Sequence, residues 1–202
     1  NQQGENFNIF RILKMGHYEV KTHSRFIYEL LDPKGSHGQN DIFLKSFVKK
    51  VLESKDFNTA KNPKREDLTD ENRRIDFTLE TNSEIFGIEM KIYADDQNNQ
   101  LFDYAKELEK RKRDGQEVKM FYLTLDGKEA SEESVTDGDG ENKIKCSNIS
   151  FKEEILNWIK DCIKQSAEKS VLREALIQYK ILIEKLTGQN EDLNMDIVDN
   201  LL

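Results

Sequence analysis

The sequence contains few of the residues that define disulfide-bonded or zinc-binding proteins. Its two cysteines, Cys146 and Cys162, are too few for a disulfide framework and match no zinc-ligand spacing. Two idle thiols are typical of a reducing cytosol, so we expect a cytoplasmic protein. No apolar run approaches the roughly 18 residues that a membrane span needs, and no signal-peptide pattern opens the chain. We therefore expect no membrane partner.

Prolines are equally rare, at Pro33 and Pro63, which permits long helices. The net charge of −8 counts against a protein that holds nucleic acid by charge alone. It does not count against an enzyme, because clustered carboxylates contribute negative charge until a metal ion neutralises them. The 202 residues include eleven Phe, six Tyr and one Trp, enough bulk for one packed domain. We expect a single domain over 1–202, with about 151–202 as a helical part packed on its core.

Hydrophobic periodicity predicts helices at both ends of the chain and strands between them. Alternating apolar and polar residues predict strands, and apolar residues at helical spacing predict helices. The expected strands are 74–80, 84–92, 119–125 and 144–151. The expected helices are 5–15, 19–31, 41–54, 98–113, 151–165 and 168–187. Residues 55–72 should be mostly irregular, and 126–143 should form a surface loop. The order predicts an α/β fold with a small mixed sheet flanked by helices, plus extra N- and C-terminal helices.

The first two strands carry a candidate site. A two-residue turn at Asn82-Ser83 would place Asp76 directly opposite Glu89. Because side chains alternate along a strand, one face then carries Asp76, Thr78, Glu89 and Lys91. The other face must be the core, and it carries Ile75, Phe77, Leu79, Phe86, Ile88 and Met90.

Opposed carboxylates repel each other across a sheet, and a cation between them removes that penalty. Asp76 and Glu89 offer hard oxygen ligands, which suit magnesium or manganese. Lys91 points into the same space, where it could stabilise an attacking hydroxide or a charged phosphoryl transition state. The alternative is an ordinary solvated polar face in which Lys91 pairs with the carboxylates.

A family resemblance favours the catalytic interpretation. Asp76, followed by Glu89-Met90-Lys91, resembles the motif of the PD-(D/E)XK nuclease superfamily, with Ile75 in place of the proline. Met90 stands where asparagine is common. Three longer stretches are similar to one bacterial branch, GIEMKIYADDQNNQLFDY, EVKTHSRFIYELLDPKGSHG and QYKILIEKLTGQ. The resemblance implies a restriction-endonuclease-like fold and hydrolysis of phosphodiester bonds.

The resemblance also implies roles for further residues. Gln100 and Tyr104 match a Q-x-x-x-Y motif, and their spacing places both on one helix face. They are expected to orient Lys91 or a substrate phosphate and to contact the substrate, with simple helix packing as the alternative. In the superfamily a Glu or a His of the first helix often completes the metal shell. Either Glu19 or His23 could do so, and the alternative for His23 is a packing role.

Four basic residues near the site are candidates for phosphate contacts, although a solvated charged face is the alternative: Arg73, Arg74, Lys106 and Lys110. The leading hypothesis is a cytoplasmic bacterial nuclease that uses magnesium or manganese. It would act on DNA rather than RNA, in defence, restriction or repair. One rival is a catalytically inactive module that binds nucleic acid on the same fold. Another is a protein-interaction module, in which the C-terminal helices bind a partner protein or a second copy of the chain.

Overall fold

A five-stranded mixed sheet forms the centre of the computed structural model, which describes residues 7–16 and 18–189. The strands are β1 Lys61–Leu68, β2 Arg74–Glu80, β3 Glu84–Lys91, β4 Glu117–Thr124 and β5 Cys146–Ser150, and they follow one another across the sheet in that order. The first three pair antiparallel, whereas β3, β4 and β5 run parallel. The predicted mixed sheet is confirmed.

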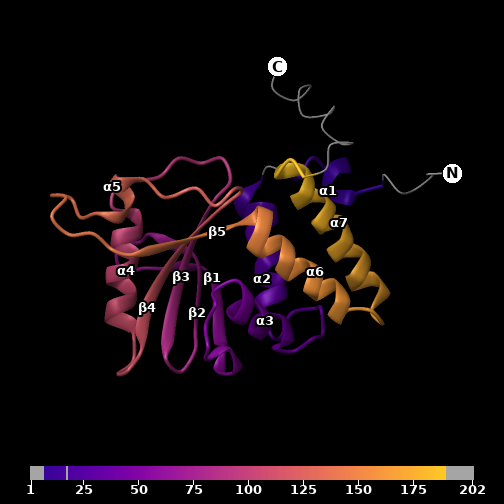
Figure 1. The fold of residues 1–202 in the computed structure, drawn as a ribbon, viewed down its shortest axis with the longest axis horizontal. Coiled ribbons are helices and arrows are strands. Elements are labelled where there is room, and N and C mark those ends of the chain that lie inside the picture. Colours follow the sequence, from indigo (N-terminus) through magenta and orange to yellow (C-terminus); the bar gives the residue numbers. More distant parts are fainter. Residues whose placement is uncertain (1–6, 17, 190–202) are drawn as a thin grey trace, which may run out of the picture.

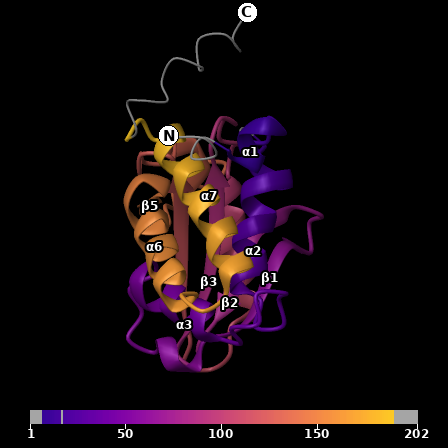
Figure 2. The ribbon, with the colours of Figure 1, turned by 90° about the vertical axis from the view of Figure 1, so that its right-hand side faces the viewer.

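Helices cover both faces of this sheet (Figures 1 and 2). On one face lies α4, Gln100–Arg111, with the short α5, Glu132–Val135, near it. On the other face lie α2, Arg25–Leu31; α3, Ile42–Lys50; α6, Leu156–Gln165; and α7, Ser170–Leu186. Shorter elements are α1 Ile9–Ile12, the 3-10 helix η2 Phe57–Thr59, and the π-helices η1 Glu19–Ser24 and η3 Phe151–Ile155. The predicted flanking helices are thus confirmed where the structure describes them. Residues 5–6 of the first expected helix, and 190–202 of the C-terminal part, lie outside the described residues.

Strand β1 corrects the prediction that residues 55–72 are mostly irregular. Its sequence, KNPKREDL, lacks the apolar alternation that marks a half-buried strand. It lies at the sheet edge and pairs only with β2, with an irregular register between Lys61 and Lys64. An edge strand tolerates Pro63, because one side of its backbone faces no neighbouring strand. The hydrophobic pattern of the sequence therefore could not predict this strand.

Two separate apolar clusters fill the two interfaces between sheet and helices. The larger one joins β2 and β3 to α2, α3, α6 and α7, and it contains Trp158, Phe43 and Phe47. The predicted core residues Phe77, Leu79, Phe86, Ile88 and Met90 belong to it and are buried. The smaller cluster lies against α4 and includes Leu101, Leu108, Met120 and Tyr122.

Ile75 is buried as predicted but packs in the α4 cluster, so its expected place on the core face with Phe77 was wrong. The pairing of β2 with β3 ends at Phe77 and Ile88. Beyond that pair the backbone N–H of Met90 donates to the Asp76 side chain, at 2.8 Å. The simple alternation of faces therefore stops at Asp76, where the candidate site begins.

No helix in the described part of the chain combines the length and the apolar character that a membrane crossing requires.

Candidate active site

The hairpin of β2 and β3 has the predicted register. Phe77 pairs with Ile88 and Glu80 pairs with Ile85, and the backbone N–H of Thr81 donates to the Glu84 carbonyl at 2.8 Å to close the turn. This register brings Asp76, just beyond the last pair, to the level of Glu89. The hydrogen bond from Met90 N–H then fixes the Asp76 carboxylate at the gap between the two strands.

The carboxyl groups of Asp76 and Glu89 lie close enough for each to shift the pKa of the other, and Lys91 lies beside them. The Lys91 ammonium Nζ is 3.0 Å from Glu89 Oε1. Only 4% of Glu89 and 7% of Lys91 are exposed, so the pair is largely removed from water. Glu89 Oε2 is also buried, and it has no hydrogen-bond partner among the described residues. A buried oxygen without a partner costs free energy, which makes it a ready acceptor for a cation or a donor.

Burial raises the pKa of both carboxyl groups, because the charged form loses its hydration. For Glu89 the next cause is repulsion from Asp76. The charge of Lys91 opposes the shift at each carboxyl group but does not cancel it. Two carboxyls with raised pKa values at one buried point form a site that favours a proton or a cation.

Glu19 reaches the site from η1 and holds the backbone that follows Lys91. Its Oε1 accepts hydrogen bonds from the backbone N–H groups of Ile92, Tyr93 and Ala94, at 2.7, 2.6 and 3.0 Å. Its charge also raises the pKa of Asp76, after burial as the main cause. The sequence offered Glu19 only as a metal ligand, because no local pattern links it to a segment 73 residues away.

His23 does not join this group, which corrects its candidacy as a metal ligand. Its Nδ1 lies 2.9 Å from the Tyr179 hydroxyl, and its Nε2 lies 2.8 Å from the Gly16 carbonyl oxygen. It is fully buried against Phe151 and Tyr179. Both ring nitrogens are engaged, so His23 braces η1 against α7. Helix η1 is also a π-helix, in which the α-helical spacing that would align Glu19 with His23 does not apply.

Gln100 and Tyr104 share one face of α4, as their spacing predicts. Gln100 Nε2 donates to the Tyr104 hydroxyl at 3.1 Å, and that hydroxyl donates to the Arg74 carbonyl at 2.7 Å. Burial and then the charge of Glu89 raise the pKa of Tyr104 to about 12. Gln100 Oε1 is buried and has no hydrogen-bond partner within residues 7–16 and 18–189. Helix α4 packs close to β3 at Gly87, where an added Cβ would lie 2.7 Å from Leu108.

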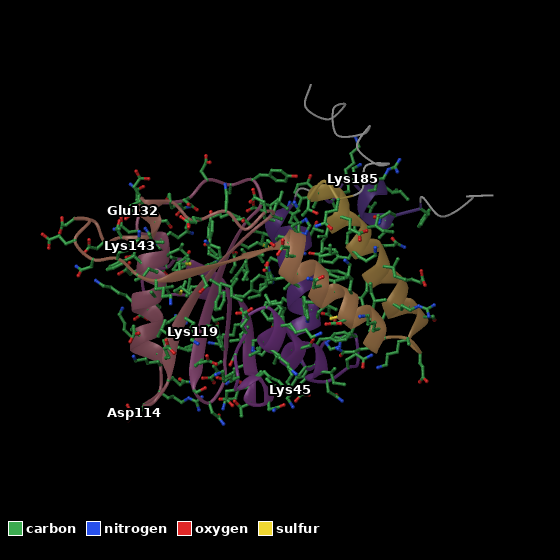
Figure 3. All side chains as sticks on the ribbon, viewed as in Figure 1. Lys45, Asp114, Lys119, Glu132, Lys143 and Lys185 are labelled. Atoms are coloured by element: carbon green, nitrogen blue, oxygen red, sulfur yellow. The ribbon has the colours of Figure 1, made fainter. Side chains whose placement is uncertain are left out.

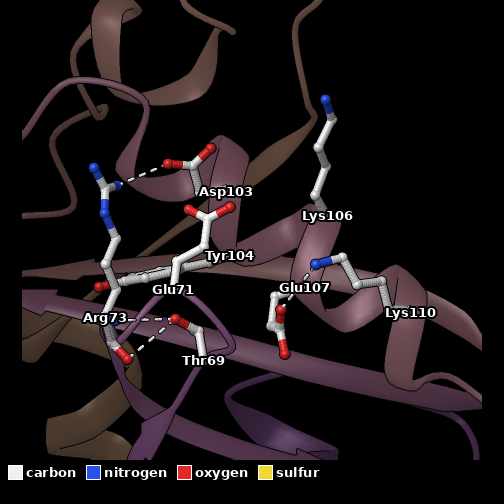
Figure 4. A pocket seen from close by; sticks show the side chains of 8 residues that line it. All are labelled: Thr69, Glu71, Arg73, Asp103, Tyr104, Lys106, Glu107 and Lys110. Carbon is white, nitrogen blue, oxygen red and sulfur yellow. Dashed lines mark hydrogen bonds and ion pairs between the residues drawn. The ribbon is translucent and has the colours of Figure 1, made fainter.

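The four predicted phosphate contacts lie in more neutral surroundings than expected. Arg73 pairs with Asp103 at 2.9 Å, and Arg74 pairs with Glu66 at 3.5 Å. Lys110 pairs with Glu107 at 3.4 Å, and Lys106 lies over the Phe102 ring, with Nζ 4.5 Å from its centroid. Arg73, Lys106 and Lys110 line one pocket of 170 Å³ (Figure 4). Three carboxylates line the same pocket and balance their positive charge: Glu71, Asp103 and Glu107. The structure therefore does not gather these cations into a strongly basic surface.

The model of the PD-(D/E)XK nuclease superfamily matches residues 7–181, and the chain belongs to that superfamily. Its members are usually nucleases and generally use divalent metal ions. No curated protein and no solved structure shows significant similarity to the chain.

The residues present fit a small divalent cation. In the described part of the chain, no three Asp, Glu, His or Cys side chains form a ready metal-binding group. The adjoining carboxylates of Asp76 and Glu89 nevertheless supply hard oxygen ligands, and in the same described part Glu89 Oε2 has no hydrogen-bond partner. Magnesium keeps several waters and needs only one or two protein carboxylates. Glu19 is the remaining candidate for a further ligand, because it lies close enough to influence Asp76.

Proposed function

We propose that this chain is a metal-dependent nuclease whose active site is formed by Asp76, Glu89 and Lys91. The observation that carries the proposal is the contact between the two carboxyl groups beside a buried lysine, with Glu89 Oε2 left without a partner. An ordinary polar face would be solvated, whereas Glu89 and Lys91 are both buried. Burying such charges costs stability, which a catalytic use explains.

Asp76 and Glu89 would hold magnesium or manganese, with Glu19 as the candidate third ligand. When bound, the ion would supply Lewis-acid activation of the phosphodiester and of a water molecule. The hydrogen bond from Met90 fixes the orientation of Asp76 before any ligand arrives. Such preorganisation lowers the cost of bringing the reacting groups together.

Lys91 would bind the phosphoryl oxygens. Its ammonium group already faces Glu89, and a phosphate near the pair would compete for its N–H donors. Charge on these oxygens grows as the transition state forms, so a fixed cation stabilises that state more than the substrate. Glu19 acts as a positioning residue, since it anchors the backbone at Ile92 and thereby the direction of Lys91.

Gln100 and Tyr104 would complete the wall of the site. The buried Gln100 Oε1 without a partner is an acceptor available to Lys91 or to a water molecule, while its Nε2 is held by Tyr104. Tyr104 is fixed in turn by the carbonyl of Arg74, which lies two residues before Asp76 on β2. The pair would orient groups at the site.

We propose DNA rather than RNA as the substrate, and a role in bacterial defence, restriction or repair in the cytoplasm, on the basis of the family alone. Residues 7–189 would act as one nuclease unit. The shared apolar cluster supports this, because it joins the strands of the site to α6 and α7.

A cleavage screen tests the proposal. Labelled single- and double-stranded DNA and RNA are incubated with the wild type in magnesium, manganese or EDTA. Asp76→Asn and Lys91→Ala should each reduce metal-dependent cleavage by about 10²–10³-fold, because each removes a group that stabilises the transition state. The matched controls are Asp114→Asn, at the far end of the sheet (Figure 3), and Lys34→Ala, which should retain wild-type rates.

Metal binding separates the two site variants. Asp76→Asn should weaken the binding of magnesium or manganese, whereas Lys91→Ala should leave it largely intact. Since Lys91→Ala also leaves Glu89 without its ion pair, Lys91→Met serves as a second variant that keeps the side-chain volume. If both Asp76→Asn and Lys91→Ala cleave at the wild-type rate, the assignment of this active site is wrong. An inactive binding module would show neither cleavage nor a difference between the variants.

A further inference from the structure

A second cavity opens beside Lys91, at the carboxyl ends of the parallel strands β3 and β4. Its volume is 320 Å³, and its lining includes Lys91, Asp126, Lys128, Lys152, Leu186 and Thr187. This end of the sheet is the one marked by Lys185 in Figure 3, opposite Asp114. Ligands of parallel sheets commonly bind at the carboxyl ends of the strands. The cavity, called the Lys91 cavity below, is thus continuous with the proposed active site through Lys91.

The backbone around the Lys91 cavity is held in place on two sides. The N–H of Lys152 donates to the Leu125 carbonyl at 3.0 Å, and the Gln189 side-chain amide donates to the Lys152 carbonyl at 2.8 Å. The N–H of Gly127 donates to the buried Thr124 hydroxyl at 2.9 Å. These bonds hold the segments that carry Lys128 and Lys152, so both lysines border the cavity in the folded protein.

The charge of the Lys91 cavity is positive although the chain as a whole is acidic. Asp126 is the one carboxylate among its lining residues, against three lysines, of which Lys91 is paired with Glu89 and Lys128 and Lys152 supply the excess charge. That carboxylate also interacts locally, since its Oδ1 accepts from the backbone N–H of Lys128 at 3.3 Å. Among the described residues, neither Lys128 nor Lys152 has an ion-pair partner, and both are exposed. Their charge is therefore available to an anionic ligand.

The pocket on the α4 face provides the contrast. Arg73, Lys106 and Lys110 are opposed there by three carboxylates, two of which form ion pairs at 2.9 and 3.4 Å. A phosphate at that pocket would have to displace those carboxylates from their partners. At the Lys91 cavity it would meet Lys128 and Lys152 without such competition, and attraction to phosphates dominates nucleic-acid affinity.

We propose that the Lys91 cavity binds a backbone phosphate of the substrate strand next to the one that is cleaved, with Lys128 and Lys152 as its contacts. This inference rests on the proposed nuclease function. It also specifies which part of the surface the substrate strand crosses. The strand passes across the carboxyl ends of β3 and β4, rather than along the α4 pocket. Because Lys128 and Lys152 would touch only the backbone, they contribute to affinity and position but not to sequence preference.

Oligonucleotide binding tests the inference without cleavage. The anisotropy of fluorescein-labelled duplex DNA, single-stranded DNA and RNA is measured in EDTA at several salt concentrations. Lys128→Gln combined with Lys152→Gln should weaken binding about tenfold at low salt and reduce the salt dependence of log K by about 1–2. A control with the same loss of charge, Lys34→Gln with Lys160→Gln, should change affinity less than about twofold. A third pair, Lys106→Gln with Lys110→Gln, should resemble the control.

The outcomes separate this inference from the proposed function. A wild type that cleaves, with Lys128→Gln/Lys152→Gln indistinguishable from the control in affinity and KM, overturns the inference alone. Equal weakening by all three pairs also overturns it, since general attraction would then explain binding. Binding that depends on Lys128 and Lys152 without metal-dependent cleavage supports the inference and removes the proposed function. A wild type that neither binds nor cleaves removes both.

Discussion

The two faces of the sheet differ in what they bury: one buries mainly apolar side chains, and the other buries polar and charged side chains as well. Against α2, α3, α6 and α7 the sheet buries a large apolar cluster that includes Trp158. Against α4 it buries a smaller one, together with the polar residues Thr78, Glu89, Lys91 and Gln100. Buried charges cost stability and apolar contacts supply it. The apolar face thus allows the α4 face to hold charged groups out of water.

The largest expected effect is on the apolar face. Phe77→Ala should reduce the free energy of unfolding by about 3–5 kcal/mol, because it leaves a cavity in the large cluster. Thr78, the next residue, lies on the α4 face and donates to Asp67 at 2.7 Å. Thr78→Ala should cost only about 1 kcal/mol. Denaturant midpoints measure both, and equal losses would remove the contrast between the faces.

The next effect is the opposite response of the two faces to acid. Burial lowers the pKa of His23 to about 4, from 6.5 in a solvated chain. The unfolded state therefore binds the proton more readily, and stability should fall as pH drops from about 6.5 to 4, by about 3 kcal/mol. Asp76 and Glu89 have raised pKa values, so their contribution changes with the opposite sign and increases stability as pH falls.

The variants His23→Gln and Asp76→Asn separate these two contributions. His23→Gln should lower stability at neutral pH but remove the acid-induced loss, which gives a flatter curve of stability against pH below 6.5. Chemical denaturation across that range measures the curves. A His23→Gln curve parallel to the wild type would show that another group causes the acid response.

A smaller effect is expected from metal binding on the α4 face. The metal-free protein should fold, and magnesium or manganese should raise its Tm, because the ion binds the paired carboxylates only in the folded state. At 100 times Kd the stabilisation is about 2.7 kcal/mol. Asp76→Asn should remove most of this rise and stabilise the metal-free protein, since it relieves the repulsion with Glu89. Thermal scans with and without metal measure both effects, and an unchanged metal response would exclude Asp76 as a ligand.

The smallest expected effect is at the edge of the site. Tyr104→Phe removes the hydroxyl that joins Gln100 to the Arg74 carbonyl, which should cost about 1 kcal/mol of stability. If Gln100 orients groups at the site, cleavage should fall about tenfold. Gln100→Ala in the same assay should give a similar loss, and the double variant should lose little more, because the two residues act together. Additive losses would contradict a shared role.

The sequence predicted the parts of the fold in which local pattern and burial agree. Strand β2 and the hairpin register followed from strict alternation and a short turn, and they brought Asp76 to Glu89. Strand β1 escaped prediction because an edge strand needs no apolar alternation. The place of Ile75 escaped because the ladder opens at Asp76. The contacts of Glu19 and His23 depend on segments far along the chain, which no local pattern encodes.

The bond between His23 and Tyr179 has a consequence for how the protein is made. The helix that carries Glu19 and His23 leaves the ribosome well before Tyr179, because 156 residues separate His23 from Tyr179. Until α7 emerges, His23 lacks the Tyr179 hydroxyl, and η1 lacks part of the support that directs Glu19 to the backbone after Lys91. The geometry of the proposed site is therefore completed only after α7 has emerged. A nascent chain that already carries Asp76, Glu89 and Lys91 still lacks their finished arrangement.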